Sequence, residues 1–178
     1  MEKYVPDIYQ KSIYNINYDA LLSRGIKFLM FDLDNTLAPI TLKEPNKKTK
    51  ELFDELKEKG FKIIIFSNSG KSRVKPFKDM LEVDCCINAH KPFKKKFLKV
   101  LETYNIEATE AAIIGDQMLT DIKGGNNVLI TTILVNPIGT KEKPWTKINR
   151  YFENQIIKRL RDNNLFTKGK YYVKDALE

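Results

Sequence analysis

Phe28-Leu29-Met30-Phe31-Asp32-Leu33-Asp34-Asn35-Thr36-Leu37 contains an apolar run that ends in two aspartates one residue apart. The apolar residues stand in near succession, which predicts a strand buried on both faces. Burying an unpaired charge is costly, so we expect the strand to end in a cleft where a cation neutralises the carboxylates. Asp32 would then lie beside a metal ion with Asp34 near it. That arrangement suits a carboxylate nucleophile with a carboxylic acid next to it.

Apolar and amphipathic segments alternate along the chain, which is typical of a parallel α/β sheet with helices on both faces. Strands are expected at residues 27–32, 61–66, 84–88, 111–115 and 128–135. Helices are expected between them at residues 47–59, 71–81, 93–104 and 118–125. No repeat or linker interrupts this order. We therefore predict a single α/β domain over residues 1–178, with its core at 26–136.

Two segments flank this core. Residues 1–25 form an N-terminal extension whose tyrosine-rich part is expected to pack against the sheet or the last helix. Asn17 or Asp19 could cap a short turn in it. A basic amphipathic helix is expected at about 144–163, on or beside the core, with apolar residues at helical spacing at Trp145, Ile148, Phe152, Ile156 and Leu160. Residues 167–178 show no clear pattern.

The composition is that of a soluble globular protein, with 42% hydrophobic and 30% charged residues among 178. The longest apolar stretches, such as Val128 to Val135, are far too short to cross a bilayer. The first residues lack the layout of a signal peptide. Cys85 and Cys86 are adjacent, which predicts free thiols in a reducing compartment. We therefore expect a cytoplasmic protein.

The net charge of +8 is unevenly distributed. Residues 141–178 hold ten Lys and Arg against five Asp and Glu, so most of the excess lies there. A basic C-terminal segment predicts attraction to an anionic partner. A phospholipid surface, a nucleic acid and an acidic protein all fit, and the charge does not choose among them.

Polar residues follow three further strands where their apolar runs stop. Ser67-Asn68-Ser69-Gly70 follows residues 61–66, His90-Lys91-Pro92 follows 84–88, and Gly115-Asp116 with Asp121 follows 111–115. Alone, each has an ordinary explanation as a turn, a helix cap or a solvated lysine. Ligands of open parallel sheets bind outside the carboxyl ends of the strands, so these groups are expected at one rim.

Four segments carry a resemblance to a known family. Asp32-Leu33-Asp34-Asn35-Thr36-Leu37, Ser67-Asn68, Lys91-Pro92 and Gly115-Asp116 with Asp121 resemble the four motifs of the haloacid-dehalogenase-like phosphohydrolases, in their proper order. Three longer segments resemble a bacterial subgroup of the YqeG type, which is similar to the mitochondrial phosphatidylglycerophosphate phosphatases. They are residues 115–126, Val135-Asn136-Pro137-Ile138 and Thr146-Lys147-Ile148-Asn149-Arg150.

The resemblance implies catalytic roles for Asp32, Asp34 and Lys91, and phosphate binding by Ser67, Asn68 and Lys91. Asp32 would attack phosphorus and form an aspartyl-phosphate. Asp34 would protonate the leaving alkoxide and then take a proton from the hydrolytic water. Ser67 and the Asn68 N–H would bind phosphate oxygens, and Lys91 would offset negative charge on the nucleophile and the phosphate.

The resemblance also implies a metal site. Mg²⁺ is the expected ion, because the site offers oxygen ligands and the chain has no Cys/His set for zinc. Its protein ligands would be the Asp32 carboxylate, the Asp34 backbone carbonyl and the Asp116 carboxylate. Asp121 would hold the waters of the ion or orient Lys91.

The implied fold is a Rossmann-like domain with about five strands in the order 5-4-1-2-3, counted along the chain. Many relatives insert a cap domain, but residues 35–66 and 68–90 are each too short for one, since a domain needs roughly 50 residues. We therefore expect an open site. An open site suits a phosphate on a lipid headgroup, a protein or a polynucleotide.

The leading substrate is phosphatidylglycerophosphate, hydrolysed to phosphatidylglycerol, with the enzyme peripheral at the inner face of the membrane. The basic last helix could contact anionic lipid, pack on the core, or do both. Another phosphomonoester, on a phosphoprotein, a nucleotide or a polynucleotide end, stays open. So does a non-catalytic protein that binds RNA or ribosomes, although no aromatic-rich RNA-binding motif is evident and nucleic acid is not expected. The oligomeric state does not follow from the sequence.

Overall fold

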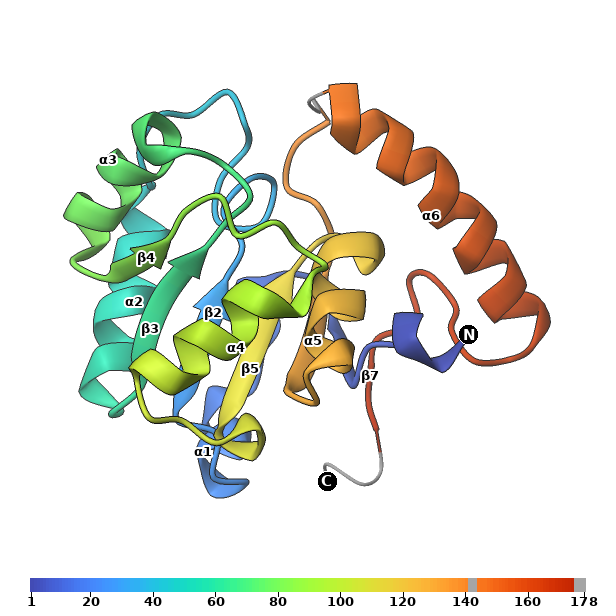
Figure 1. The fold of residues 1–178 in the computed structure, drawn as a ribbon, viewed down its shortest axis with the longest axis horizontal. Coiled ribbons are helices and arrows are strands. Elements are labelled where there is room, and N and C mark those ends of the chain that lie inside the picture. The colour runs from blue at the N-terminus through green and yellow to red at the C-terminus, as the bar shows by residue number, and fades with distance from the viewer. Residues whose placement is uncertain (141–143, 175–178) are drawn as a thin grey trace.

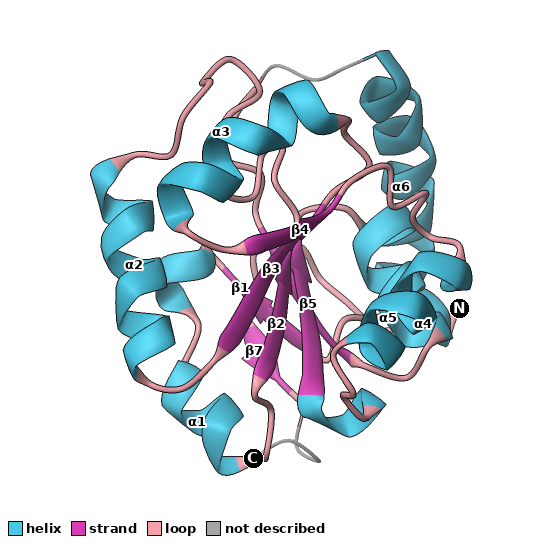
Figure 2. Ribbon diagram, turned by 60° about the vertical axis from the view of Figure 1, so that its left-hand side comes forward, coloured by secondary structure: helices cyan, strands magenta, loops and turns pink. Residues whose placement is uncertain are grey.

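A seven-stranded sheet runs through the molecule in the order β4-β3-β2-β5-β6-β1-β7 (Figures 1 and 2). The computed structural model describes residues 1–140 and 144–174, with the backbone alone at 144–147. Neighbouring strands are parallel, except that β7 is antiparallel to β1. The strands are β1 (Ile8–Gln10), β2 (Phe28–Phe31), β3 (Lys62–Phe66), β4 (Asp84–Cys86), β5 (Ala111–Gly115), β6 (Thr131–Val135) and β7 (Tyr172–Val173).

Helices cover both faces of the sheet, with α1, α2 and α3 on one side and α4, α5 and α6 on the other (Figure 2). They are α1 (Tyr18–Ser23), α2 (Lys47–Glu58), α3 (Lys71–Leu81), α4 (Lys94–Thr103), α5 (Lys123–Asn127) and α6 (Pro144–Asp162). A π-helical turn at Met118–Ile122 runs directly into α5, and 3₁₀ turns lie at Glu2–Tyr4, Ile13–Asn15 and Ala108–Glu110. The side chain of Asn17, one of the two expected caps, accepts a hydrogen bond from Ala20 N at the start of α1.

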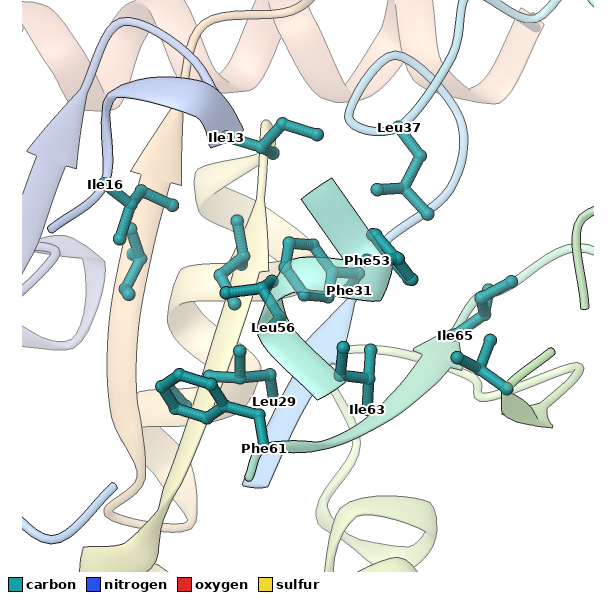
Figure 3. Packing of buried hydrophobic residues seen from close by; sticks show 14 of the residues in the cluster. Ile13, Ile16, Leu29, Phe31, Leu37, Phe53, Leu56, Phe61, Ile63 and Ile65 are labelled. Atoms are coloured by element: carbon teal, nitrogen blue, oxygen red, sulfur yellow. The ribbon is translucent and has the colours of Figure 1, made fainter. Parts of the chain in front are cut away.

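Strand β2 is buried on both faces, as its apolar run predicts. Leu29 and Phe31 point into the cluster beneath α2, where the rings of Phe31 and Phe53 lie 5.0 Å apart (Figure 3). Phe28 and Met30 belong to the opposite cluster, under α4. Full burial of such a side chain contributes roughly 1.5–3 kcal/mol, so this strand is a strong anchor for the residues that follow it.

The mostly parallel α/β architecture and the order of the five expected strands are confirmed. Counted along the chain, those strands are β2, β3, β4, β5 and β6, which lie in the order 5-4-1-2-3. The expectation of about five strands is wrong, because β1 and β7 extend the sheet to seven. Residues 8–10 and 172–173 are too short to show the alternation by which a strand is recognised. Pairing with β6 and with each other makes them strands.

The buried apolar side chains of α6 lie in its second half. Leu160 is buried and Ile156 partly buried, in a cluster with Tyr9 of β1. Ile148 and Phe152 of the predicted stripe are instead 47% and 54% exposed. The Trp145 side chain lies outside the described residues. None of the described helices, α6 included, combines the length and the hydropathy that a membrane span requires.

Candidate active site

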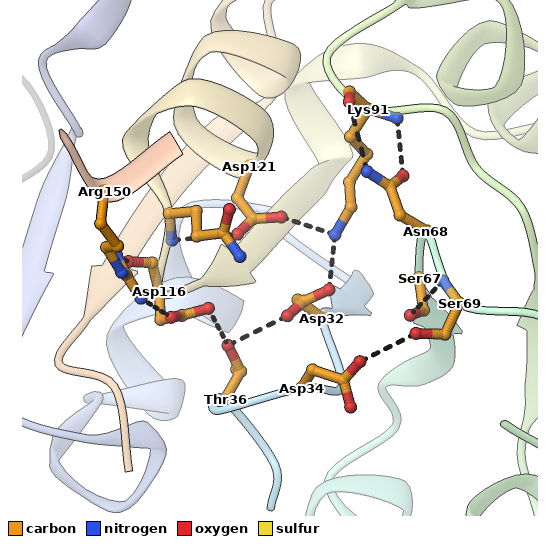
Figure 4. A network of polar contacts seen from close by, with 11 residues as sticks. Asp32, Asp34, Thr36, Ser67, Asn68, Ser69, Lys91, Asp116, Asp121 and Arg150 are labelled. Atoms are coloured by element: carbon orange, nitrogen blue, oxygen red, sulfur yellow. Dashed lines mark hydrogen bonds and ion pairs between the residues drawn. The ribbon is translucent and has the colours of Figure 1, made fainter. Parts of the chain in front are cut away.

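The carboxyl ends of β2, β3 and β5 bring the expected site residues together with Lys91 (Figure 4). Asp32 directly follows β2, and its backbone N–H donates to Ile114 O of β5 at 2.9 Å. The same register pairs Phe31 with Ile114, two residues before Asp116. The sheet therefore places Asp32 and Asp116 at the same edge of the molecule.

Lys91 bridges two carboxylates inside the protein. Its Nζ lies 2.6 Å from Asp32 Oδ1 and 2.6 Å from Asp121 Oδ1, and its side chain is 2% exposed. Burial acts to lower the pKa of Lys91, but the carboxylates of Asp121 and Asp32 outweigh it and raise the pKa above its ordinary value. Lys91 is therefore a fixed positive charge next to the proposed nucleophile.

The loop that carries Lys91 is held by Asn68. Asn68 Oδ1 accepts from Lys91 N at 2.7 Å, and its Nδ2 donates to Lys91 O at 3.3 Å. The Asn68 side chain is thus engaged with the backbone of Lys91. Ser67 is buried, and its Oγ accepts from Ser69 N at 3.1 Å. The only histidine, His90, is exposed beside this loop.

Asp121 is fixed from both sides. Lys91 donates to its Oδ1, and Gln117 N donates to its Oδ2 at 3.1 Å. Its carboxyl group packs against the end of β5, where a Cβ on Gly115 would lie 2.2 Å from the Asp121 carboxyl carbon. Glycine is therefore required at position 115 for Asp121 to reach the site. These contacts suit the orienting role toward Lys91.

Asp116 is surrounded by donors that sequence reasoning did not identify. Thr36 Oγ1 donates to Asp116 Oδ1 at 3.2 Å, and Arg150 of α6 donates to Asp116 Oδ2 and, at 2.9 Å, to its backbone oxygen. Arg150 is itself held by the buried Glu153, which lies 2.8 Å away and also accepts from Leu119 N at 3.0 Å. One helix outside the expected core thus reaches the candidate metal site.

The Asp34 carboxylate contacts Ser69 and Arg73 rather than the other site residues described so far. Its Oδ2 accepts from Ser69 Oγ at 2.8 Å and its Oδ1 from Arg73 Nε of α3, also at 2.8 Å. Arg73 further donates to the carbonyl oxygens of Pro39 and Leu42, in the loop after β2. Sequence reasoning missed Arg73, because nothing in the helical pattern of α3 marks it as a partner of Asp34.

Three carboxylates form a compact cluster that fits a divalent cation. One oxygen from each of Asp32, Asp116 and Asp121 lies within 4.8 Å of the others. Burial raises the pKa of Asp32 to about 6, although Lys91 opposes it. Burial likewise raises the pKa of Asp116 well above its ordinary value, against the lowering effect of Arg150. Lys91 and Arg150 thus do not fully offset the cost of burying these carboxylates in their charged form. A hard divalent cation, which prefers oxygen ligands, would supply the missing positive charge.

Comparisons with known proteins agree with this geometry. The family model described as haloacid dehalogenase-like hydrolase matches residues 38–128. The chain is 35% identical to "Probable phosphatase YqeG" of Bacillus subtilis over 158 residues, which are 89% of this chain and 92% of that protein. The chain belongs to the haloacid dehalogenase-like hydrolases. The family and the enzyme class expected from the four motifs are therefore confirmed.

More distant relatives bear on the substrate and on the fold. The chain is 27% identical to "Phosphatidylglycerophosphate phosphatase 1, chloroplastic" of Chlamydomonas reinhardtii, over 79% of this chain and 56% of that protein. Among solved structures, the deoxy-D-mannose-octulosonate 8-phosphate phosphatase of Haemophilus influenzae, bound to cobalt, superposes with a TM-score of 0.53 at 14% identity. That superposition covers 78% of this chain and 90% of the other, and it supports the fold alone.

Proposed function

We propose that this hydrolase is a Mg²⁺-dependent phosphomonoesterase that works through an aspartyl-phosphate on Asp32. The observation that carries the proposal is the buried group of Asp32, Asp116 and Asp121 with Lys91 between two of them. Positioning and charge stabilisation supply most of the catalysis in phosphoryl transfer, and this group offers both. The "Probable phosphatase" that is 35% identical to the chain supports the same reaction.

In this reaction Asp32 is the nucleophile and Asp34 transfers protons. Asp32 forms a bond to phosphorus through one carboxylate oxygen while the bond to the leaving oxygen breaks. Asp34 gives its proton to that leaving oxygen and later takes one from the water that releases phosphate. The Arg73 contact stabilises the ionised carboxylate of Asp34, the form required for the second step. Ser67 and the Asn68 N–H hold phosphate oxygens at the rim.

The carboxylates of Asp32 and Asp116, with the backbone carbonyl of Asp34, would hold Mg²⁺, and Asp121 would orient Lys91. When bound, the ion would offset the negative charge that nucleophile and phosphate bring together. Lys91 contributes to the same end through its contact with Asp32 Oδ1. Thr36 and Arg150 hold the two oxygens of Asp116, and so set its direction.

For the substrate, we propose phosphatidylglycerophosphate. Two relatives carry that activity in their names, at 27% and 28% identity. The described residues leave no room for a cap, because the loop with α2 fills the interval from β2 to β3, and α3 fills the interval from β3 to β4. A site without a cap can approach a headgroup that stays in a bilayer. The protein would then act peripherally at the inner face of the membrane.

The test is a phosphatase assay on the purified full chain. We expect hydrolysis of an aryl phosphate and of phosphatidylglycerophosphate in mixed micelles, both requiring Mg²⁺ and both lost in Asp32→Asn. Hydrolysis of the aryl phosphate without the lipid would overturn the substrate and keep the chemistry. Failure to hydrolyse any phosphomonoester in a panel of lipid, nucleotide and phosphopeptide substrates with Mg²⁺ would overturn the phosphatase itself.

A further inference from the structure

Large apolar side chains are exposed on separate segments around the candidate active site. Their exposed fractions lie between 44% and 71%. They come from the loop after β2, the start of α4, the loop after β6 and the first half of α6. The residues, which we call the rim residues, are Leu42, Phe93, Ile138, Ile148 and Phe152.

Two of the rim residues have backbone contacts next to Asp34. The carbonyl of Leu42 accepts from Arg73, the partner of Asp34. Ile138 N donates to Asn35 O at 2.9 Å, next to Asp34 in the catalytic loop. These backbone contacts hold the two segments that carry Leu42 and Ile138 close to the loop of Asp34.

The other three rim residues approach from the opposite segments. Phe93 stands two residues after Lys91. Ile148 and Phe152 lie on α6, two residues before and two residues after Arg150, on a different face of the helix from the one by which Arg150 reaches Asp116. The rim residues therefore come from four separate chain segments near the site, with only Ile148 and Phe152 sharing a helix.

The same face carries an unusual arrangement of charge. Helices α2, α3 and α4 have no acidic residue in their first turn. They begin instead with exposed or half-exposed lysines, namely Lys47 and Lys48 in α2, Lys71 in α3, and Lys94, Lys95 and Lys96 in α4. The helix dipole disfavours cations at this end. The last turns of these helices are mixed in charge, with Glu58 beside Lys57 in α2, Asp79 beside Lys78 in α3, and Glu102 in α4.

Topology places these lysines around the site. Each of the three helices follows a parallel strand, so its N-terminus lies at the carboxyl edge of the sheet, where Asp32 and Asp116 lie. Lysines and helix N-termini together make this edge strongly attractive to anions. At the N-termini of α2, α3 and α4 alike, lysines stand where the helix dipole disfavours a positive charge.

We propose that this edge, the lysines with the rim residues, docks on an anionic lipid bilayer. The lysines would lie at the level of the lipid phosphates, and the rim residues would enter the boundary between headgroups and acyl chains. The site would then open toward the membrane. The inference deepens the proposed function and rests on it for the substrate, although docking can be measured without turnover.

The apolar rim separates a bilayer from other anionic partners. Phe93 and Phe152 offer a stacking surface to a nucleic acid, but the other three rim residues, Leu42, Ile138 and Ile148, are aliphatic and do not. A stable protein partner seated on this edge would cover the site that must admit substrate. A fluid bilayer can accept apolar side chains and present a phosphorylated headgroup at the same time.

The experiment measures sedimentation of Asp32→Asn full-length protein with vesicles, so that no lipid is consumed. We expect binding to vesicles of phosphatidylcholine with 30% phosphatidylglycerol and at least tenfold weaker binding to pure phosphatidylcholine. Phe93→Ser with Phe152→Ser should weaken binding at least tenfold. The matched control is Leu129→Ser, because Leu129 is 81% exposed and precedes β6 at the opposite edge.

A second pair of variants tests the charge. Lys94→Gln with Lys95→Gln should weaken binding to the anionic vesicles at least fivefold. Lys27→Gln with Lys62→Gln removes the same charge near the amino ends of β2 and β3 and should leave binding unchanged. In the Asp32-containing protein, the Phe93/Phe152 variant should keep aryl phosphate hydrolysis and lose hydrolysis of vesicle-borne lipid.

Equal binding to both vesicle types, or equal effects of the edge variants and their controls, would overturn docking. If single-stranded RNA binds as tightly as the anionic vesicles, and the same edge variants lose RNA binding, the partner is a nucleic acid and membrane docking is overturned. If the wild-type protein does not hydrolyse an aryl phosphate, the proposed function fails instead. The failure of docking and the failure of the proposed function are therefore distinguishable.

Discussion

Asp34 is proposed to donate a proton in the first reaction step and to accept one in the second. Its carboxylate accepts from Ser69 Oγ and Arg73 Nε at 2.8 Å each, which fixes it beside the site. Asp34→Asn keeps the shape and removes the exchangeable proton. We expect kcat for an aryl phosphate to fall about 10²-fold or more. Steady-state kinetics at saturating Mg²⁺ measure it, and an unchanged kcat would remove Asp34 as the acid and base.

Lys91 and its two carboxylates form a buried ion group in which each member depends on the others. Lys91→Met would leave Asp32 and Asp121 without their cation, and breaking such a group costs about 3–5 kcal/mol. We expect that loss in urea unfolding of the metal-free protein, together with loss of turnover. Lys94→Met, at an exposed lysine three residues away, should change stability by less than about 0.5 kcal/mol. Equal effects of both substitutions would contradict the buried bridge.

Asp32 makes the stability of the metal-free protein depend on pH in a particular direction. Burial raises its pKa to about 6 from an ordinary value of 3.8, so the native state binds the extra proton between these values. Stability contributed by this group is therefore lost as pH rises from 4 to 6, by about 3 kcal/mol. The free energy of unfolding of Asp32→Asn should therefore increase relative to that of the wild type as pH rises from 4 to 6. Urea unfolding in EDTA at several pH values measures the difference, and a difference that stays flat would contradict the pKa.

At the scale of elements, α6 is the part of the site that the sequence least revealed. The carboxylates could be predicted because each follows a buried strand, where a charge needs an explanation. Arg150 and Glu153 lie in an amphipathic helix, where charges are ordinary, and their roles depend on how that helix is placed. One signal was available: Glu153 stands next to the apolar stripe, and the structure buries it.

The edge strands and the turn at Met118–Ile122 show the same limit. Residues 118–125 were predicted as one helix, and they form a π-helical turn that continues into α5. That turn brings Asp121 beneath Gly115, a tertiary demand that overrides regular helix geometry. Long buried strands and capped helices follow from periodicity, whereas β1 and β7 exist only through their partners.

Helix α6 should therefore affect metal binding. Arg150→Ala would leave Asp116 Oδ2 without its guanidinium donor, and loss of such an orienting partner costs about 10–100-fold in metal affinity. We expect the Mg²⁺ concentration for half-maximal activity to rise by that factor, while Arg159→Ala, at an exposed position of the same helix, leaves it unchanged. Titration of activity with Mg²⁺ measures both. An unaltered Mg²⁺ requirement in Arg150→Ala would show that α6 serves stability alone.

For the whole molecule, the buried negative charge of the site links folding to metal. Mg²⁺ at 100 times its dissociation constant should stabilise the native state by about 2.7 kcal/mol. In a chain of this length we expect the melting temperature to rise by roughly 5–10 °C. Calorimetry with and without Mg²⁺ measures the shift, and Asp116→Asn should abolish it. A shift that survives in that variant would place the ion elsewhere.

The pairing of β1 with β7 has a consequence for synthesis on the ribosome. Asp32, Lys91, Asp116 and Asp121 all emerge before α6, yet the guanidinium that faces Asp116 is carried by that helix, which precedes β7. Among the described strands β7 pairs only with β1, so the contact between residues 8–10 and residues 172–173 forms after β2 to β6 and α6 have been synthesised. A nascent chain would thus carry every carboxylate of the proposed site before it carried the guanidinium that holds Asp116 in place.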